Sequence, residues 1–304
     1  MKNILIFFLI CASQLTAQEY GSEEKKTFPD KGAGCAPPTT STYMEINNVR
    51  ALMHTAGNLW QIPGLNNSQY EVPKNSGIMA LFTAALWLGG TDVNEQLKLA
   101  ALRYRNGQDY WTGPITEVFA ETDYATCDAY DKHFITTQDM VREFTSWFEA
   151  GVADQQNGTN TQANLHPNYE VPDIIKNWPA HGDLSAGQDY YLAPFYDYNE
   201  DGHYNWQDGD YPWHDINRTK ECTVDRTVSL YGDLNFWWVM NDKGNIHTET
   251  GADPIGMEIR SQAFSFASND EVNNMTFYNY ELINRGTQTL YDTYFGFFTD
   301  GALG

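Results

Sequence analysis

Positively charged side chains are scarce in this sequence. Its 304 residues include 18 Lys and Arg against 40 Asp and Glu, which gives a formal net charge of −22 at pH 7. A chain this acidic is repelled by phosphate backbones and by anionic lipid surfaces. Nucleic acid is therefore excluded as a partner, whereas solubility outside the cell or the binding of divalent cations fits the charge.

Motifs for catalysis are also missing. The sequence contains neither the GxSxG pattern of a nucleophilic serine nor the HExxH pattern of a zinc enzyme, and it has no CxxC pair. Hydrogen-bonded loop or strand positions suit the scattered histidines, which are His54, His133, His166, His181, His203, His214 and His247. Since 40 acids always place some carboxylates close together, their presence is no evidence for a glycosidase. The sequence names no catalytic residue, and this favours a non-enzymatic protein.

The N-terminus has the pattern of a secretory signal peptide. Lys2 is followed by the apolar run Ile4–Ala12 and then by Ala17, a small residue suited to cleavage. This run is much shorter than the roughly 20 apolar residues of a membrane helix, and no later run is long enough either. We therefore expect residues 1–17 to be removed. The mature chain should begin near Gln18, lack a transmembrane segment, and be secreted to an extracellular or cell-surface location.

Two segments follow the signal peptide. Residues 18–41 are polar and rich in Pro, Gly and Thr, which predicts a linker or a loosely attached arm. Residues 42–304 are expected to form one β-rich domain, truncated at its C-terminal end. An oxidising compartment allows one disulfide among Cys35, Cys127 and Cys222. Sequence alone leaves open which two of the three cysteines pair.

Short alternating segments predict an antiparallel β-sandwich-like domain with one or two short helices and long loops. The apolar segment 78–90 ends in Gly89-Gly90-Thr91-Asp92 and precedes a second strand pattern, as in a hairpin. Further strands are predicted at SLYGDLNFWWVMND, MEIRSQAFSFA, NMTFYNYELINR and LYDTYFGFF. Residues 241–245 predict a tight turn that leads into one more strand at IHTET.

One segment has the pattern of an amphipathic helix. TTQDMVREFTSWFEAG begins with Thr136 or Thr137 as the N-cap, and Gly151 is expected to end the helix. Its apolar face is formed by Met140, Phe144, Trp147 and Phe148. A stripe of this kind is typical of core packing. A second, short helix is predicted to start at Pro172.

The stretch DYNEDGHYNWQD, residues 197–208, has the spacing of a calcium loop. Such a loop places oxygen ligands at positions 1, 3, 5, 7, 9 and 12 and a glycine at position 6. The corresponding residues are Asp197, Asn199, Asp201, His203, Asn205 and Asp208, with Gly202 at the turn. His203 is compatible because position 7 contributes its backbone carbonyl, and Asn205 can hold the water that commonly serves position 9. We therefore expect calcium as the metal at these residues.

Two departures define the kind of calcium loop. Position 12 is Asp208 instead of the Glu that closes a sensor site. The flanks are not helical, since Pro212 opposes a continuing helix. The loop is similar to those of dockerins and thrombospondin type 3 repeats, which implies a structural role for the ion. Asp210 lies outside the twelve-residue frame, so its replacement is expected to leave most of the response to calcium intact.

Several motifs together carry a resemblance to a known group of proteins. In order along the chain they are INNVRA, LWLGG, LAALRYRNGQDYWTGP, TCDAYDKHF, NWPAHGD, LAPFYDYNEDGHYNWQDGDYP, WWVMND, PIGMEIRSQAFSFA and NNMTFYNYELINR. From about residue 46 to residue 298 the chain resembles the N-terminal region of large secreted proteins of Bacteroidota. Those proteins are usually exported by the type IX secretion system and carry a C-terminal sorting domain. The resemblance implies an extracellular or cell-surface protein with no established enzymatic activity.

Aromatic residues support a second interpretation. Trp206 and Trp213 lie in or near the loop and could form a platform on which sugar rings stack. Trp237 and Trp238 fall in a predicted strand, where core packing suits them better. The chain is thus expected to be a non-catalytic, calcium-stabilised surface or extracellular-matrix module whose partner is an unknown surface protein or glycan. The alternative is a carbohydrate-binding or carbohydrate-degrading module.

Overall fold

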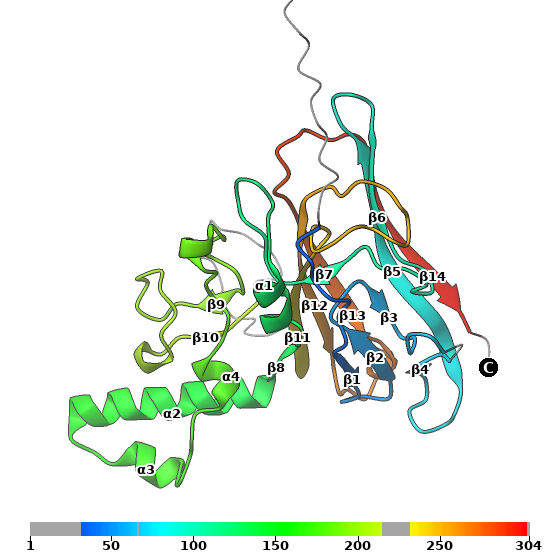
Figure 1. Cartoon of the computed structure of the whole chain (residues 1–304). Coiled ribbons are helices and arrows are strands. Elements are labelled where there is room, and N and C mark those ends of the chain that lie inside the picture. The colour runs from blue at the N-terminus through cyan, green and yellow to red at the C-terminus, as the bar shows by residue number, and fades with distance from the viewer. Residues whose placement is uncertain (1–31, 66, 215–231, 303–304) are drawn as a thin grey trace, which may run out of the picture. The chain divides into compact units, whose positions relative to one another are not determined.

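Two antiparallel β-sheets pack face to face in the described part of the chain (Figure 1). The computed structural model describes residues 32–302 except 66 and 215–231. The predicted signal peptide and Cys222 lie outside these residues. The fold is mainly β and sandwich-like, with helices and long loops, so the fold class predicted from the strand pattern is confirmed.

The larger sheet has seven strands. They are β1 (Ser41–Met44), β2 (Arg50–His54), β3 (Asn58–Leu59), β4 (Tyr70–Glu71), β5 (Met79–Thr91), β6 (Leu97–Ala101) and β14 (Tyr291–Gly301). The long strand β5 is central, because it pairs with β3, β4, β6 and β14. The apolar segment 78–90 is therefore a strand, and β5 and β6 form the hairpin that its Gly-Gly exit predicted.

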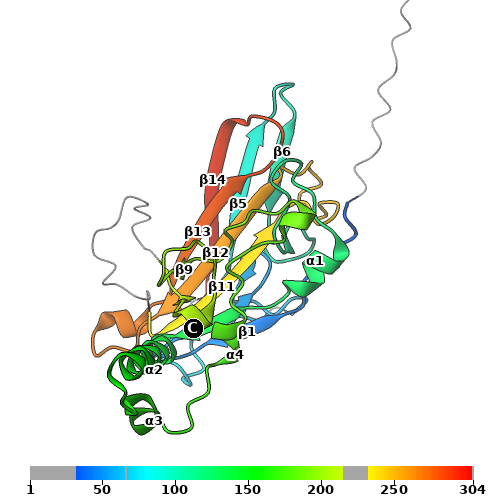
Figure 2. The same cartoon turned by 90° about the vertical axis from the view of Figure 1, so that its left-hand side faces the viewer.

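The second sheet has five strands. They are β7 (Trp111–Thr112), β8 (Phe134–Thr137), β11 (Leu234–Asn241), β12 (Met257–Ser265) and β13 (Phe277–Asn284). β12 lies between β11 and β13, and β7 and β8 pair with β11. Figure 2 shows that the long strands of both sheets run with nearly the same tilt, as in an aligned sandwich.

The main core lies between the two sheets and follows the alternation of the strands. β11 directs Phe236, Trp238 and Met240 into it, where they pack with residues of β5 such as Ala84 and Leu88. The intervening residues of β11 are buried on the opposite face of the sheet. β11 is thus covered on both sides, which explains why its sequence is almost continuously apolar.

A layer of helices and loops covers the outer face of β11 (Figure 1). The helices are α1 (Tyr124–Ala129), α2 (Gln138–Asn157), α3 (Thr161–Leu165) and α4 (Asp173–Lys176), with 3-10 turns at Leu184–Ala186 and Trp206–Asp208. A further 3-10 turn, Glu271–Asn274, connects β12 and β13. Trp237 and Val239 of β11 pack against Trp178 and Leu192 of this layer. Of the helices in the described ranges, none is both long and apolar enough to span a membrane.

Helix α2 begins where the sequence predicted and ends later. The side chain of Thr137 accepts a hydrogen bond from the N–H of Met140 at 3.2 Å, so Thr137 is the N-cap. Gly151 does not end the helix, which continues to Asn157 before Gly158 adopts a left-handed conformation at φ 70°. Gly151 instead provides room for the side chain of Gln162 in α3. The close approach of α3 explains this glycine.

The described part of the N-terminal arm, residues 32–41, is attached firmly to the sandwich. Cys35 is buried and forms a disulfide with Cys127 of α1, which decides among the three pairings that the sequence left open. The N–H of Cys35 also donates to the carbonyl of Gly244 at 3.0 Å. Further along, Thr39 and Thr40 donate backbone N–H groups to the carboxylate of Asp131. Residues 32–41 are thus bonded to the domain, whereas residues 18–31 of the predicted arm lie outside the described part of the chain.

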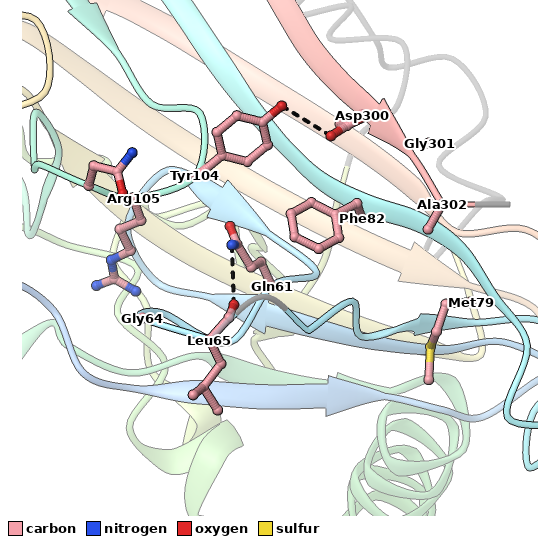
Figure 3. A pocket seen from close by; sticks show the side chains of 11 residues that line it. Gln61, Gly64, Leu65, Met79, Phe82, Tyr104, Arg105, Asp300, Gly301 and Ala302 are labelled. Carbon is pink, nitrogen blue, oxygen red and sulfur yellow. Dashed lines mark hydrogen bonds between the residues drawn. The ribbon is translucent and has the colours of Figure 1, made fainter. Parts of the chain in front are cut away.

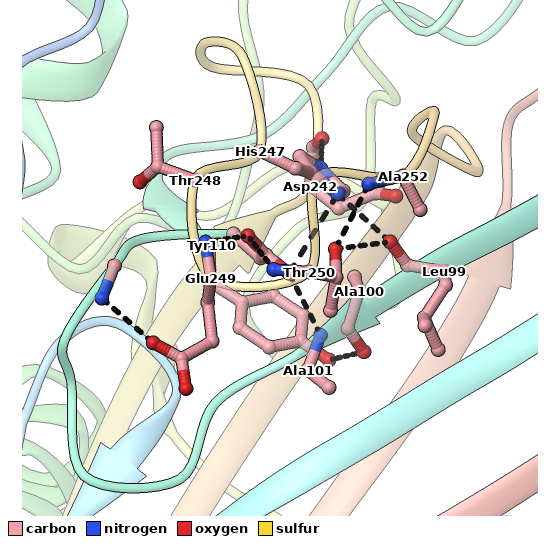
Figure 4. A network of polar contacts seen from close by, with 12 residues as sticks. Leu99, Ala100, Ala101, Tyr110, Asp242, His247, Thr248, Glu249, Thr250 and Ala252 are labelled. Atoms are coloured by element: carbon pink, nitrogen blue, oxygen red, sulfur yellow. Dashed lines mark hydrogen bonds and ion pairs between the residues drawn. The ribbon is translucent and has the colours of Figure 1, made fainter.

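Residues 242–256 form a long loop in place of the predicted turn and strand at IHTET (Figure 4). β11 pairs with β12 beyond the loop, so the hairpin prediction was wrong. The loop is held by Asp242, whose buried carboxylate accepts the N–H groups of Ile255, Gly256 and Met257. Burial raises the pKa of Asp242, while nearby His247 and the three N–H donors act in the opposite direction.

His247 closes the same network from inside the loop. Its two ring nitrogens lie 2.8 Å from the carbonyl oxygen of Leu99 and 2.7 Å from that of Asp242. The carboxylate of Asp109 lies 3.8 Å away. A polar network has therefore replaced strand pairing as the constraint on this segment.

Strand β14 lies at one edge of the seven-stranded sheet. Phe295 and Phe297 pair with Leu88 and Leu86 and so face inward, yet they are 58% and 44% exposed. The sandwich is open along this edge in the described residues. On the other face of the sheet, Phe298 stacks on Trp87 of β5 with ring centroids 5.3 Å apart. β14 thus contributes an aromatic ring to the outer surface of the sheet.

Candidate metal centre

The loop predicted to bind calcium is closed at its base by a short strand pair. β9 (Phe195–Tyr196) and β10 (Tyr211–Pro212) pair in antiparallel fashion on either side of it. The prediction that no helices flank the loop is therefore confirmed. Gly202, at the position of the sharp turn, has φ 77°, a backbone conformation that favours glycine.

The first half of the loop brings together the side chains of Asp197, Asn199 and Asp201. The carboxylate of Asp197 accepts the N–H of Gly202 at 2.7 Å and that of Asp201 at 3.2 Å. The amide of Asn199 donates to Asp201 at 3.0 Å, and Asp201 accepts the N–H of His203 at 2.8 Å. This last bond is the largest cause of the lowered pKa of Asp201. Three oxygen-bearing side chains thus fold onto one turn.

The remaining predicted ligands are arranged differently. Asn205 donates its side-chain amide to the carboxylate of Asp208 at 2.7 Å, so these two residues pair with each other. The imidazole of His203 points outward, where it contacts the hydroxyl of Tyr190 at 3.0 Å and stacks on His181. His203 can therefore offer the loop only its backbone carbonyl, as the spacing predicted.

Asp210 lies inside the loop although the twelve-residue frame leaves it out. Its carboxylate is fully buried and accepts the N–H of Tyr198 at 2.8 Å and the N–H of Asn205 at 2.8 Å. It therefore joins the two halves of the loop. Burial raises its pKa, and the neighbouring carboxylates of Asp197 and Asp201 raise it further. Sequence reasoning missed this residue, and its position after the Gly209 turn was the only available signal.

The donor set suits a hard divalent cation, because it consists of carboxylate, amide and carbonyl oxygens. In the described geometry the carboxylates accept hydrogen bonds from N–H groups of their own loop. Each ionised carboxylate has about four acceptor sites, so capacity for an ion remains. Within residues 32–302, apart from the gaps, no group of three or more His, Cys, Asp or Glu side chains is arranged around a common metal position. The residues therefore fit calcium chemically but are not preassembled around it.

Trp206 and the histidines, the other residues considered from the sequence, make packing contacts or hydrogen bonds within the fold. Trp206 packs beside Phe144 and Ile175 in a small core under α2, which makes it a poor platform for sugars. Each of the seven histidines has a hydrogen-bond contact, as their loop and strand positions suggested. Burial lowers the pKa of His54 to about 4 and that of His133 to about 3. These two imidazoles are neutral at physiological pH.

Comparison with known proteins identifies no relative: no family model, no curated protein and no solved structure matches the chain. The function is therefore inferred from the residues and contacts of this chain.

Proposed function

We propose that the chain is a non-catalytic module of an extracellular or cell-surface protein, in which a calcium ion fixes the connection between β9 and β10. The proposed ligands are the side chains of Asp197, Asn199, Asp201 and Asp208 and the backbone carbonyl of His203. Asn205 holds a water molecule that binds the ion. Asp210 is added as a further carboxylate, because its side chain joins the two halves of the loop.

The electrostatics of Asp210 carry this proposal. A buried carboxylate beside two further carboxylates is destabilising at neutral pH unless positive charge balances it. The described residues supply two N–H donors to it. An ion with two positive charges would supply the remaining compensation. Calcium fits better than magnesium, since it accepts an irregular set of oxygen ligands and gives up its hydration water more easily.

Calcium should raise the melting temperature of the protein. An ion that binds only the folded state adds RT ln(1 + [L]/Kd), about 2.7 kcal/mol at a hundredfold excess over Kd. For a domain of this size that corresponds to a rise of ~5–10 °C. Differential scanning calorimetry in EDTA and in 10 mM calcium measures the effect, and magnesium should produce much less. Asp201→Ala and Asp210→Ala should each remove the response.

The matched control is Asp173→Ala, which removes an acid on α4 whose side chain is 92% exposed and should leave the response intact. The response should also weaken as the pH is lowered towards the ordinary pKa of an aspartate. The raised pKa of Asp210 means that the folded, calcium-free protein holds this proton more tightly than the unfolded chain. Stability without calcium therefore falls as pH rises above the ordinary aspartate value, and the calcium effect grows over the same range. Identical melting curves in EDTA and calcium would show that the loop is only a polar turn.

Export is the second part of the proposal. The apolar run Ile4–Ala12 and the small residue Ala17 predict cleavage by signal peptidase. In a bacterial expression host with an intact secretion pathway, N-terminal sequencing of the product outside the cytoplasm should begin at Gln18 or within two residues of it. A cytoplasmic product that retains Met1 would contradict the extracellular assignment.

A further inference from the structure

A groove of about 760 Å³ lies on the outer surface of the seven-stranded sheet (Figure 3). Its walls come from β5, from the segment after β6 and from the end of β14, while the loop around Gln61 forms its floor. We call it the aromatic groove and define it by Gln61, Leu65, Phe82, Tyr104 and Asp300. The volume is in the range of small-molecule sites, roughly 300–1,000 Å³. The groove is far in sequence from the candidate calcium loop.

Aromatic rings form a continuous row along this groove. Phe82 and Tyr104 have ring centroids 5.9 Å apart, and Tyr104 meets Phe298 edge-on at 5.8 Å. Phe298 then stacks on Trp87, so the row continues beyond the groove. Tyr104 and Trp87 are each 38% exposed, which is unusual for large rings that already contact other rings. Such a row offers apolar faces to successive flat units of a ligand.

Gln61 places an unused hydrogen-bond acceptor at the groove floor. The residue is 4% exposed, and Figure 3 shows its amide between Tyr104 and the carbonyl of Leu65. Its Nε2 donates to the carbonyl of Leu65 at 3.4 Å, which fixes the orientation of the amide. Its Oε1 has no hydrogen-bond partner among the described residues. A buried acceptor without a partner is costly, so a hydroxyl donor from a ligand would relieve it.

Asp300 adds a second acceptor on the opposite side. The hydroxyl of Tyr104 donates to its Oδ2 at 3.1 Å. A carboxylate has about four acceptor sites, so Asp300 can also accept hydrogen bonds from a ligand. Arg105 also lines the groove, where its guanidinium donates to the carbonyl of Pro38 and to the side chain of Gln108. The groove thus offers aromatic faces, two acceptors and one charge of each sign.

We propose that the aromatic groove binds a neutral oligosaccharide. Sugar rings present an apolar C–H face that suits Tyr104 and Phe82, and hydroxyl donors that suit Gln61 and Asp300. An anionic ligand such as a nucleotide or an acidic glycan is disfavoured by Asp300 and by the net charge of −22. A purely apolar ligand would leave both acceptors desolvated without partners. This site is independent of calcium at residues 197–210.

The test is binding of the full mature chain to an array of neutral and acidic glycans, followed by calorimetry with the best neutral hexasaccharide. Tyr104→Ala should weaken binding at least tenfold, and Gln61→Leu should do the same by removing Oε1. Tyr104→Phe keeps the ring and should cost less than fivefold. The affinity should be the same in EDTA and in 10 mM calcium. An acidic hexasaccharide should bind at least tenfold more weakly than the neutral one.

The matched control is Phe119→Ala, which removes an aromatic ring that is 64% exposed on a loop away from the groove. Its affinity should equal that of the parent protein. Melting temperatures of all variants separate lost binding from lost folding, and Tyr104→Phe remains informative if Gln61→Leu is unstable. The proposal is overturned if no neutral glycan binds at millimolar concentration, or if binding survives Tyr104→Ala unchanged.

Discussion

Removal of the Cys35–Cys127 disulfide should lower the free energy of unfolding by roughly 4–5 kcal/mol. The two cysteines are separated by 92 residues, so the cross-link closes a long loop and strongly restricts the unfolded chain. The double variant Cys35→Ser/Cys127→Ser should melt ~10 °C or more below the parent protein. Chemical denaturation followed by fluorescence gives the free energy, since nine tryptophans report on folding.

The disulfide also holds one end of an arm that has its own hydrogen bonds. Cys35 contacts Gly244 and Asn245 through the backbone, and Thr40 contacts Asp131. Loss of the cross-link should therefore make the arm sensitive to proteases before the sandwich unfolds. Cys222→Ser is the control, because it replaces the third cysteine of the mature chain without breaking this bond. A double variant within 1 kcal/mol of the parent would mean that the hydrogen bonds alone hold the arm, against the estimate of roughly 4–5 kcal/mol.

The features that the sequence predicted well are those set by local patterns. The sequence pattern of the strands β5, β11, β12 and β13 reflects their burial. Apolar and polar residues alternate where one face of a strand is buried, and the residues are continuously apolar where both faces are buried. The N-cap at Thr137 follows from a threonine that can reach a backbone N–H three residues later. Such features depend on neighbours within a few residues, which the sequence displays directly.

The features that the sequence did not predict depend on distant partners. Gly151 would end an isolated helix, yet contact with Gln162 keeps it inside α2. The segment IHTET alternates like a strand, but His247 bonds to Leu99 across the fold. Residues 32–41 have the composition of a linker, yet Cys35 is bonded to Cys127, which is 92 residues away in the sequence. In each case tertiary contact overrides a local preference, and a single sequence does not reveal such contacts.

The same distinction applies to the two candidate sites. The candidate calcium loop is contiguous, so its spacing could be read directly, whereas Asp210 hydrogen-bonds to the loop from beyond the twelve-residue frame and gave no such signal. The aromatic groove has no sequence signal, since Gln61, Tyr104 and Asp300 come from three distant segments. The earlier carbohydrate hypothesis therefore named Trp206 and Trp213, which are prominent in sequence. The carbohydrate site proposed above lies on a different surface, at the aromatic groove.

Asp242→Ala should be among the most destabilising single substitutions in the protein. The carboxylate of Asp242 is fully buried, with Oδ1 accepting the N–H groups of Gly256 and Met257 and Oδ2 accepting that of Ile255. Alanine leaves all three N–H groups buried without an acceptor, at about 1–3 kcal/mol each. We expect a loss of roughly 3–6 kcal/mol in the free energy of unfolding, because partial relaxation lets some of these groups reach water.

Asp242→Asn provides a graded test of the same geometry. An asparagine oxygen in the place of Oδ1 can still accept from Gly256 and Met257, while its amide nitrogen would face the N–H of Ile255. One hydrogen bond of the three is then lost, and the expected cost is ~1–3 kcal/mol. The control is Asp253→Ala in the same loop, whose exposed side chain pairs with Lys98 and should contribute less than ~1 kcal/mol. Urea denaturation of the three variants should therefore rank them Asp242→Ala, Asp242→Asn, Asp253→Ala. If Asp242→Ala is no worse than Asp242→Asn, the three N–H groups do not depend on this carboxylate, and another constraint holds the loop against β12.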